Sequence, residues 1–133
     1  MNWYIKFLNK NQEYLYLAFR LIIGIMFFLH GIMKFPDILS GATPFFSQIW
    51  FAGMIETISG ALFIIGLYTS YAAFFTGGEM LVAFIQVHVG MSGTLNPILN
   101  KGEPAVLFFA AFIIFLIKGS GRYSLDHLLQ KRR

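Results

Sequence analysis

The sequence predicts an all-α membrane protein, a four-transmembrane-helix bundle with both termini cytoplasmic, and three observations lead to this fold class. Of the 133 residues, 57% are hydrophobic and only 12% are charged, whereas soluble domains carry roughly twice that charged fraction. The apolar residues form long segments that are separated by short stretches rich in Gly, Pro and Asn. Lys and Arg are concentrated on alternate flanks of these segments, as the positive-inside rule requires.

Each expected span approaches the roughly 20 residues that cross a bilayer core, although the fourth is short. The four spans cover about residues 14–33, 46–68, 71–89 and 104–118. Pro36 and Pro44 interrupt helix before the second span, and a tight turn at Gly66 leads into the third. A basic, aromatic lead (1–13) is expected to lie on the membrane surface, and a basic tail (119–133) follows the last span. We expect residues 1–133 to form a single membrane domain.

Counting Lys and Arg in the flanks orients the bundle. One side carries Lys6, Lys10, Lys118, Arg122, Lys131, Arg132 and Arg133, and the other carries only Lys34 and Lys101. Both termini are therefore expected in the cytoplasm. The net charge of +4 resides mostly in the tail, which favours anionic lipid as its partner rather than nucleic acid. Because the chain has no cysteine, it cannot itself perform thiol chemistry.

Three charged residues fall inside the expected spans: Arg20, Glu56 and Glu79. The helical rise places both carboxylates about 14 Å into a ~30 Å core, near the midplane. An unpaired charge at that depth is costly, so we expect Arg20 to pair with at least one carboxylate in an intramembrane cluster. Two interpretations stay open: the cluster only stabilises the bundle, or it forms a proton or ligand site.

A second polar set is expected near the outer surface. It comprises His30, Lys34, His88 and Glu103, together with Gln86 from the same face of the third span as Glu79. The plainest interpretation is ordinary hydrogen bonding at headgroup level. The alternatives are a site for the polar head of a quinone, because histidine can donate to a carbonyl oxygen, and haem ligation by the two histidines. Two histidines without a third ligand do not predict a metal site.

The tail contains a helix-start signal. After the Gly119-Ser120-Gly121 break, the last span should stop near Lys118, and a short amphipathic helix should begin with Ser124 as its N-cap. Its leucines would face the bilayer and its basic residues would face water and anionic headgroups. A frayed basic tail is the alternative.

Several strings resemble the DoxX family of small four-span membrane proteins. They are Arg20-x3-Gly24, His30-Gly31-x2-Lys34, Glu56-x3-Gly60, Gly66-Leu67-Tyr68-Thr69 and the ending Gly121-Arg122-Tyr123-Ser124-Leu125-Asp126. The chain departs from the family pattern in two places. It has Asn100-Lys101-Gly102-Glu103 where Asn-Gly-Gly-Glu is frequent, and Gly119-Ser120-Gly121 where Gly-Pro-Gly is usual.

The resemblance implies an integral protein of the bacterial plasma (inner) membrane. Some family members accompany a thiosulfate:quinone oxidoreductase or a membrane-associated oxidoreductase complex, and many have no assigned activity. The expected function is therefore that of an accessory or quinone-contacting subunit of a membrane oxidoreductase system, with quinone as its candidate cofactor. Its expected partners are the lipid bilayer, an oxidoreductase subunit and further copies of itself. The alternatives are a non-enzymatic structural subunit or anchor and a small-molecule transporter.

Overall fold

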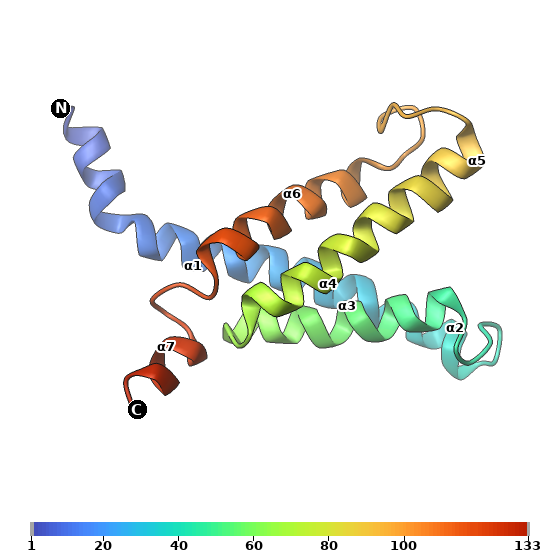
Figure 1. Ribbon diagram of the computed structural model, residues 1–133, viewed down its shortest axis with the longest axis horizontal. Coiled ribbons are helices and arrows are strands. Elements are labelled where there is room, and N and C mark those ends of the chain that lie inside the picture. Colours follow the sequence, from blue (N-terminus) through green and yellow to red (C-terminus); the bar gives the residue numbers. More distant parts are fainter. Residues whose placement is uncertain (1, 133) are drawn as a thin grey trace.

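The computed structural model describes residues 2–132, which are mainly helical and contain no β-strand. Met1 of the lead and Arg133 of the basic tail lie outside the described residues. Figure 1 shows the arrangement of the helices. In chain order they are α1 (Trp3–Ile32), α2 (Phe35–Leu39), α3 (Gln48–Ile65), α4 (Thr69–Val82), the π-helix η1 (Ala83–Val89), α5 (Gly90–Ser92), α6 (Glu103–Lys118) and α7 (Leu125–Gln130).

Within residues 2–132, three helical segments are long and apolar enough to cross a membrane: Trp3–Leu39, Gln48–Ile65 and Thr69–Ser92. Helix α6 coincides closely with the expected fourth span. Its 16 residues extend about 24 Å, which is less than a ~30 Å hydrocarbon core. The protein is thus an all-helical membrane protein with three candidate spans.

The helix boundaries refine the sequence prediction at several points. The lead, expected as a separate surface segment, is the first part of α1, which runs unbroken from Trp3. Helix α3 begins later than expected because Phe46 adopts a positive φ of 62° and the Ser47 hydroxyl caps the helix, accepting from the Trp50 N–H at 3.3 Å. It ends before Gly66, whose φ of 69° stops the helix.

The helices associate as two pairs. Helix α1 packs chiefly along α3, helix α4 packs along α6, and contacts between α3 and α4 join the pairs. Glycines allow the backbones of α1 and α3 to approach closely. A Cβ atom added at Gly31 would lie 2.5 Å from the Thr57 nitrogen, and one added at Gly60 would lie 2.5 Å from the Phe28 nitrogen.

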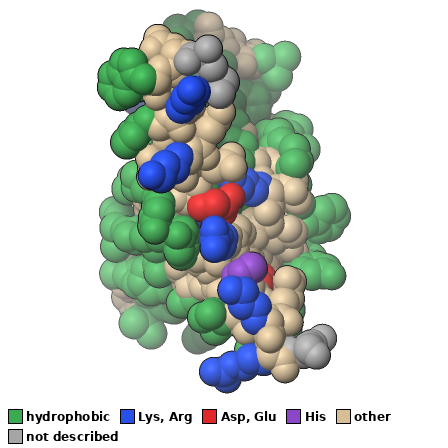
Figure 2. Space-filling view, turned by 90° about the vertical axis from the view of Figure 1, so that its left-hand side faces the viewer, with side chains coloured by type: hydrophobic (Ala, Val, Ile, Leu, Met, Phe, Trp, Pro, Cys, Tyr) green, Lys and Arg blue, Asp and Glu red, His purple; other side chains and the backbone are tan. Residues whose placement is uncertain are grey.

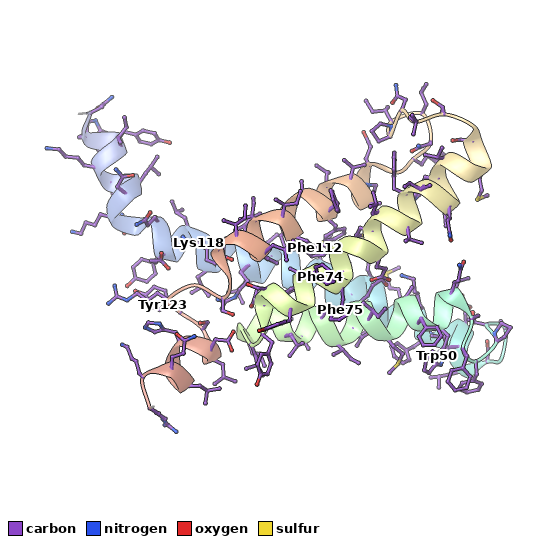
Figure 3. All side chains as sticks on the ribbon, viewed as in Figure 1. Trp50, Phe74, Phe75, Phe112, Lys118 and Tyr123 are labelled. Atoms are coloured by element: carbon purple, nitrogen blue, oxygen red, sulfur yellow. The ribbon has the colours of Figure 1, made fainter. Side chains whose placement is uncertain are left out.

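An aromatic core connects the two pairs. Phe27 of α1, Phe63 of α3 and Phe112 and Phe115 of α6 are almost completely buried. The Phe27 and Phe112 ring centroids are 4.9 Å apart, as are those of Phe63 and Phe115. Phe112 lies near the middle of α6 in Figure 3. Edge-to-face and tilted contacts of this kind favour one relative placement of the helices.

Both described ends of the chain lie at one end of the bundle, which we call the tail end; α2 and the loop before α6 lie at the other, the loop end (Figure 1). Figure 2 views the tail end and shows Lys and Arg side chains gathered on it. Figure 3 places Lys118 and Tyr123 here and Trp50 at the loop end. Lys118 forms an ion pair with Glu13 at 3.2 Å.

The tail is docked rather than frayed. The last long helix ends at Lys118, and α7 begins where predicted, with the Ser124 hydroxyl accepting from the His127 N–H at 3.2 Å. The Asp126 N–H donates to the Gly66 carbonyl at 3.1 Å, and the Asp126 carboxylate accepts from the Tyr68 N–H at 2.9 Å. These contacts attach α7 to the turn between α3 and α4.

Candidate functional site

Arg20 does not join a cluster with Glu56 and Glu79, so the expected ion pair is wrong. Its buried guanidinium donates instead to the backbone carbonyls of Ser120 and Tyr123, the latter at 2.7 Å, at the tail end. The physical reason is depth. Arg20 precedes Lys34 by 14 residues, roughly 20 Å along a helix, and it is Lys34 that reaches Glu56.

Lys34, the residue just before α2, forms an ion pair with Glu56 in the middle of α3. The Glu56 side chain is 5% exposed and that of Lys34 is 27% exposed. Gly53 lies one turn before Glu56, and a Cβ added there would be 3.4 Å from the Lys34 Cβ. The small residue therefore leaves room for the lysine stem to pass along α3 toward the carboxylate.

Glu79 of α4 differs from Glu56 in that it has no ion-pair or hydrogen-bond partner among the described residues. Both of its carboxylate oxygens are buried, and neither has a hydrogen-bond partner. The charged side chains that interact electrostatically with Glu79 are Glu56 and Lys34. Lys34, Glu56 and Glu79 thus lie near one another, but only Lys34 and Glu56 form an ion pair.

A cavity of about 440 Å³ adjoins this group, and we call it the ion-pair cavity. Its polar lining consists of Lys34, Glu56, Glu79, Gln48 and Gln86, and the rest is apolar. Phe51, Phe75 and Val82 line it and are also about half exposed or more. In a transmembrane bundle, exposed apolar side chains face lipid. The cavity therefore opens toward the hydrocarbon of the bilayer.

A second cavity of about 270 Å³, the histidine cavity, also adjoins the ion pair. It is lined by His30 and His88, and it shares Lys34 and Glu56 with the ion-pair cavity. The His88 Nδ1 lies 3.1 Å from the Asn100 carbonyl oxygen, which fixes the orientation of this ring. The His30 ring packs edge-to-face on Phe108.

Helix α4 and the π-helix that continues it both line the two cavities. Residues Ala83–Val89 form η1, which carries Gln86 and His88 toward the two cavities. Wider helical turns of this type occur frequently at functional sites. The Gln48 side-chain amide donates to the Gln86 side-chain oxygen at 3.2 Å, bridging α3 and η1 beside the ion-pair cavity.

The expected outer polar set is therefore divided. Lys34 lines both cavities, Gln86 lines the first, and His30 and His88 line the second. Glu103 joins neither: it is exposed at the start of α6, because a carboxylate there is favoured by the helix dipole. Within residues 2–132, no group of three or more His, Asp and Glu side chains is arranged to hold a metal ion.

Sequence reasoning did not connect Lys34 with Glu56. A signal was present, since Arg20, Gly24, Phe27 and Gly31 form one stripe of α1 that ends at Lys34, and the structure buries the first four of them. A lysine at the end of a buried stripe was as good a partner for Glu56 as an arginine near its start. Gln48 and the π-helix carried no sequence signal.

Comparison with known proteins agrees with this picture. Residues 15–89 match the DoxX family. An uncharacterized protein of Haemophilus influenzae is 35% identical over 131 residues, covering 94% of this chain and 98% of the relative. A Bacillus subtilis protein named "Putative oxidoreductase CatD" is 29% identical, with 93% of each chain covered. An uncharacterized membrane protein of Mycobacterium tuberculosis is 28% identical, covering 87% of this chain and 82% of the relative.

No solved structure matches the chain significantly. The family match covers more than half of the sequence and includes most of α1 together with α3, α4 and η1. It also includes the site residues Lys34, Glu56, Glu79, His30 and His88. The first relative extends the similarity over nearly the whole chain. The protein is a membrane protein of the DoxX family.

Proposed function

We propose that this protein is a quinone-contacting, accessory subunit of a membrane oxidoreductase system, and that the ion-pair cavity receives the polar head of the quinone. The Bacillus subtilis relative is named as an oxidoreductase. A soluble redox enzyme would require such a subunit in order to exchange electrons with a molecule that is dissolved in the bilayer.

The observation that carries the proposal is the chemistry of the cavity. A volume of about 440 Å³ lies in the range of small-molecule sites, which combine apolar walls with a few polar groups. Phe51 and Phe75 offer aromatic surface at a mouth that faces lipid. Lys34 and Gln86 offer N–H donors for a carbonyl oxygen. A hydrophobic ligand bearing a polar, planar head fits all three features.

The proposal includes the topology. Helix α6 is the fourth span, residues 1–133 form one domain of the bacterial inner membrane, and both termini lie in the cytoplasm. The basic tail end supports this orientation. The loop end, with Lys34 and the two cavities, then lies toward the outer leaflet. Partner oxidoreductase subunits and further copies of the chain are the proposed neighbours.

The test measures quinone binding to the purified protein in lipid nanodiscs. Trp3→Phe leaves Trp50, beside Phe51 and at the loop end, as the single tryptophan. Because quinones quench indole fluorescence, titration with decylubiquinone or menadione should quench Trp50 to saturation. Gly78 lines the cavity, and a Cβ added there meets open space. Gly78→Leu should therefore fill the cavity and abolish saturable quenching.

Gly90→Leu is the matched control. Gly90 is an exposed glycine of the same continuous helical segment, lies outside both cavities and has ordinary space for a Cβ. It should quench as the wild type does. Equal quenching of both variants would show that quinone does not occupy the cavity. Purification with an intact partner subunit and no saturable quenching would favour the structural anchor instead.

A further inference from the structure

The group that the quinone site leaves unexplained is Glu79. Its two oxygens are buried and unpartnered, although it lines the same cavity as Gln86 and the Lys34–Glu56 pair. Every other charged side chain of that lining has its partner. Lys34 cannot serve both carboxylates equally, because it forms an ion pair with Glu56 alone.

The charged side chains around Glu79 provide no ion-pair partner for its carboxylate. Helix α3, which packs against α4, presents Glu56, a charge of the same sign, and Lys34 lies nearby, between α1 and α2. The histidines belong to the neighbouring cavity, and Glu103 of α6 is exposed outside both cavities. An isolated carboxylate ion in an apolar, lipid-facing cavity is costly, whereas a carboxylic acid is not.

A neutral carboxylic acid carries an O–H group that can donate a hydrogen bond. Glu79 lines the ion-pair cavity together with the adjacent Gly78, where an added Cβ would meet open space. An unsatisfied buried donor is itself unfavourable. A ligand that supplies an acceptor oxygen therefore gains a hydrogen bond without displacing an existing one.

We infer that Glu79, held as a carboxylic acid, is a further hydrogen-bond donor of the cavity beside Lys34 and Gln86, and that it selects a ligand head bearing a neutral carbonyl oxygen. This inference rests on the proposed function and names which side chain recognises the quinone. It separates the two carboxylates by role: Glu56 neutralises Lys34, and Glu79 contacts the ligand. It also excludes a cationic head, which would require Glu79 as an anion.

Carbodiimide labelling tests whether Glu79 is held as a carboxylic acid, and this test needs no ligand. Dicyclohexylcarbodiimide is lipid-soluble and reacts with protonated carboxyl groups. Peptide mapping of the nanodisc protein treated at neutral pH should find Glu79 modified, and Glu56 far less so. Decylubiquinone should slow the modification of Glu79. Preferential modification of Glu56 would overturn the assignment, and so would a Glu79 that reacts at the same rate with and without saturating quinone.

Substitutions of Glu79 test whether it donates a hydrogen bond to the ligand head, and quenching of Trp50 fluorescence measures the binding. Glu79→Gln retains a neutral donor and should bind decylubiquinone within about threefold of wild type. Glu79→Leu removes the donor and should weaken binding by about three- to tenfold, the worth of one net hydrogen bond. Glu103→Gln, which removes a carboxylate outside both cavities, should bind as wild type does.

The outcomes distinguish the two proposals. If wild type binds quinone and Glu79→Leu binds equally well, the role of Glu79 is wrong while the quinone site stands. If Glu79→Gln fails as badly as Glu79→Leu, a neutral donor at position 79 is not sufficient for binding, and the role assigned to Glu79 is wrong. If wild type shows no saturable binding, the quinone site itself fails, whatever the labelling pattern.

Discussion

Lys34, between α1 and α2, forms an ion pair with Glu56 in the middle of α3, and both residues line the two cavities. Glu56 is nearly buried, whereas Lys34 retains 27% of its side-chain exposure. The pair therefore combines two properties: it fixes the contact between two helices, and it leaves the lysine reachable from the cavities.

We expect each single substitution of this pair to destabilise the protein and the double substitution to restore most of the loss. Lys34→Met leaves the Glu56 carboxylate buried without a partner, and Glu56→Gln leaves an uncompensated lysine. Breaking a buried pair costs about 3 kcal/mol or more, whereas replacing both partners is often nearly neutral. SDS-induced unfolding in mixed micelles measures the free energies.

Lys101→Met is the control for loss of one positive charge, since Lys101 is exposed in the loop before α6, and it should be neutral. If the effects of Lys34→Met and Glu56→Gln simply add in the double variant, the two residues are not coupled.

Glycine substitutions test the contact between α1 and α3. Gly31→Ala and Gly60→Ala place a Cβ within 2.5 Å of a backbone nitrogen of the facing helix. Overpacking of this kind costs about 1–3 kcal/mol. Gly78→Ala is the matched control: its Cβ meets open space, and replacing a helical glycine stabilises by up to about 1 kcal/mol. Three variants of equal stability would contradict the close approach.

Arg20 should hold the tail in place. Its guanidinium donates to the carbonyls of Ser120 and Tyr123, and this two-carbonyl contact needs the planar fork of arginine. In Arg20→Lys the tail should open more often, so trypsin should cleave after Arg122 at least about fivefold faster in nanodiscs, the effect of losing one net hydrogen bond of ~1 kcal/mol.

Lys10→Arg is the control for Arg20→Lys, because it exchanges the same two side chains at an exposed position of α1. Cleavage after Arg122 should then remain at the wild-type rate. Should Arg20→Lys also be cleaved at the wild-type rate, the docking of the tail would depend on Asp126 and not on Arg20.

Local signals in the sequence predicted much of the fold. Apolar length indicated the long helices, Ser124 indicated the start of α7, and the stripe ending at Lys34 indicated the buried face of α1. These features depend on residues within a few turns of one another, so periodicity and capping rules reach them.

The site depended on longer-range geometry. Counting residues placed both carboxylates near the midplane and predicted Arg20 as their partner, but this count could not determine how far α1 extends beyond the bundle at its start. Which positive side chain meets Glu56 depends on the axial register of α1 against α3, and this register is set by the contacts of Gly31 and Gly60. The π-helical turn at Ala83–Val89 likewise has no signal in the local sequence that distinguishes it from an α-helix.

The last prediction concerns α6, whose 16 residues are few for a span. Two tail contacts support a full crossing: the tail reaches Arg20 of α1 and the Gly66 turn between α3 and α4, both at the tail end, although α6 starts from the loop end.

Because the chain has no cysteine, Asn96→Cys and Lys131→Cys give unambiguous single labels on either side of α6. In intact spheroplasts, a membrane-impermeant maleimide should label Asn96→Cys only, and lysis should expose Lys131→Cys. Lys6→Cys should behave as Lys131→Cys does. Labelling of positions 96 and 131 from the same side would show that α6 does not cross the membrane, and the four-span topology would be wrong.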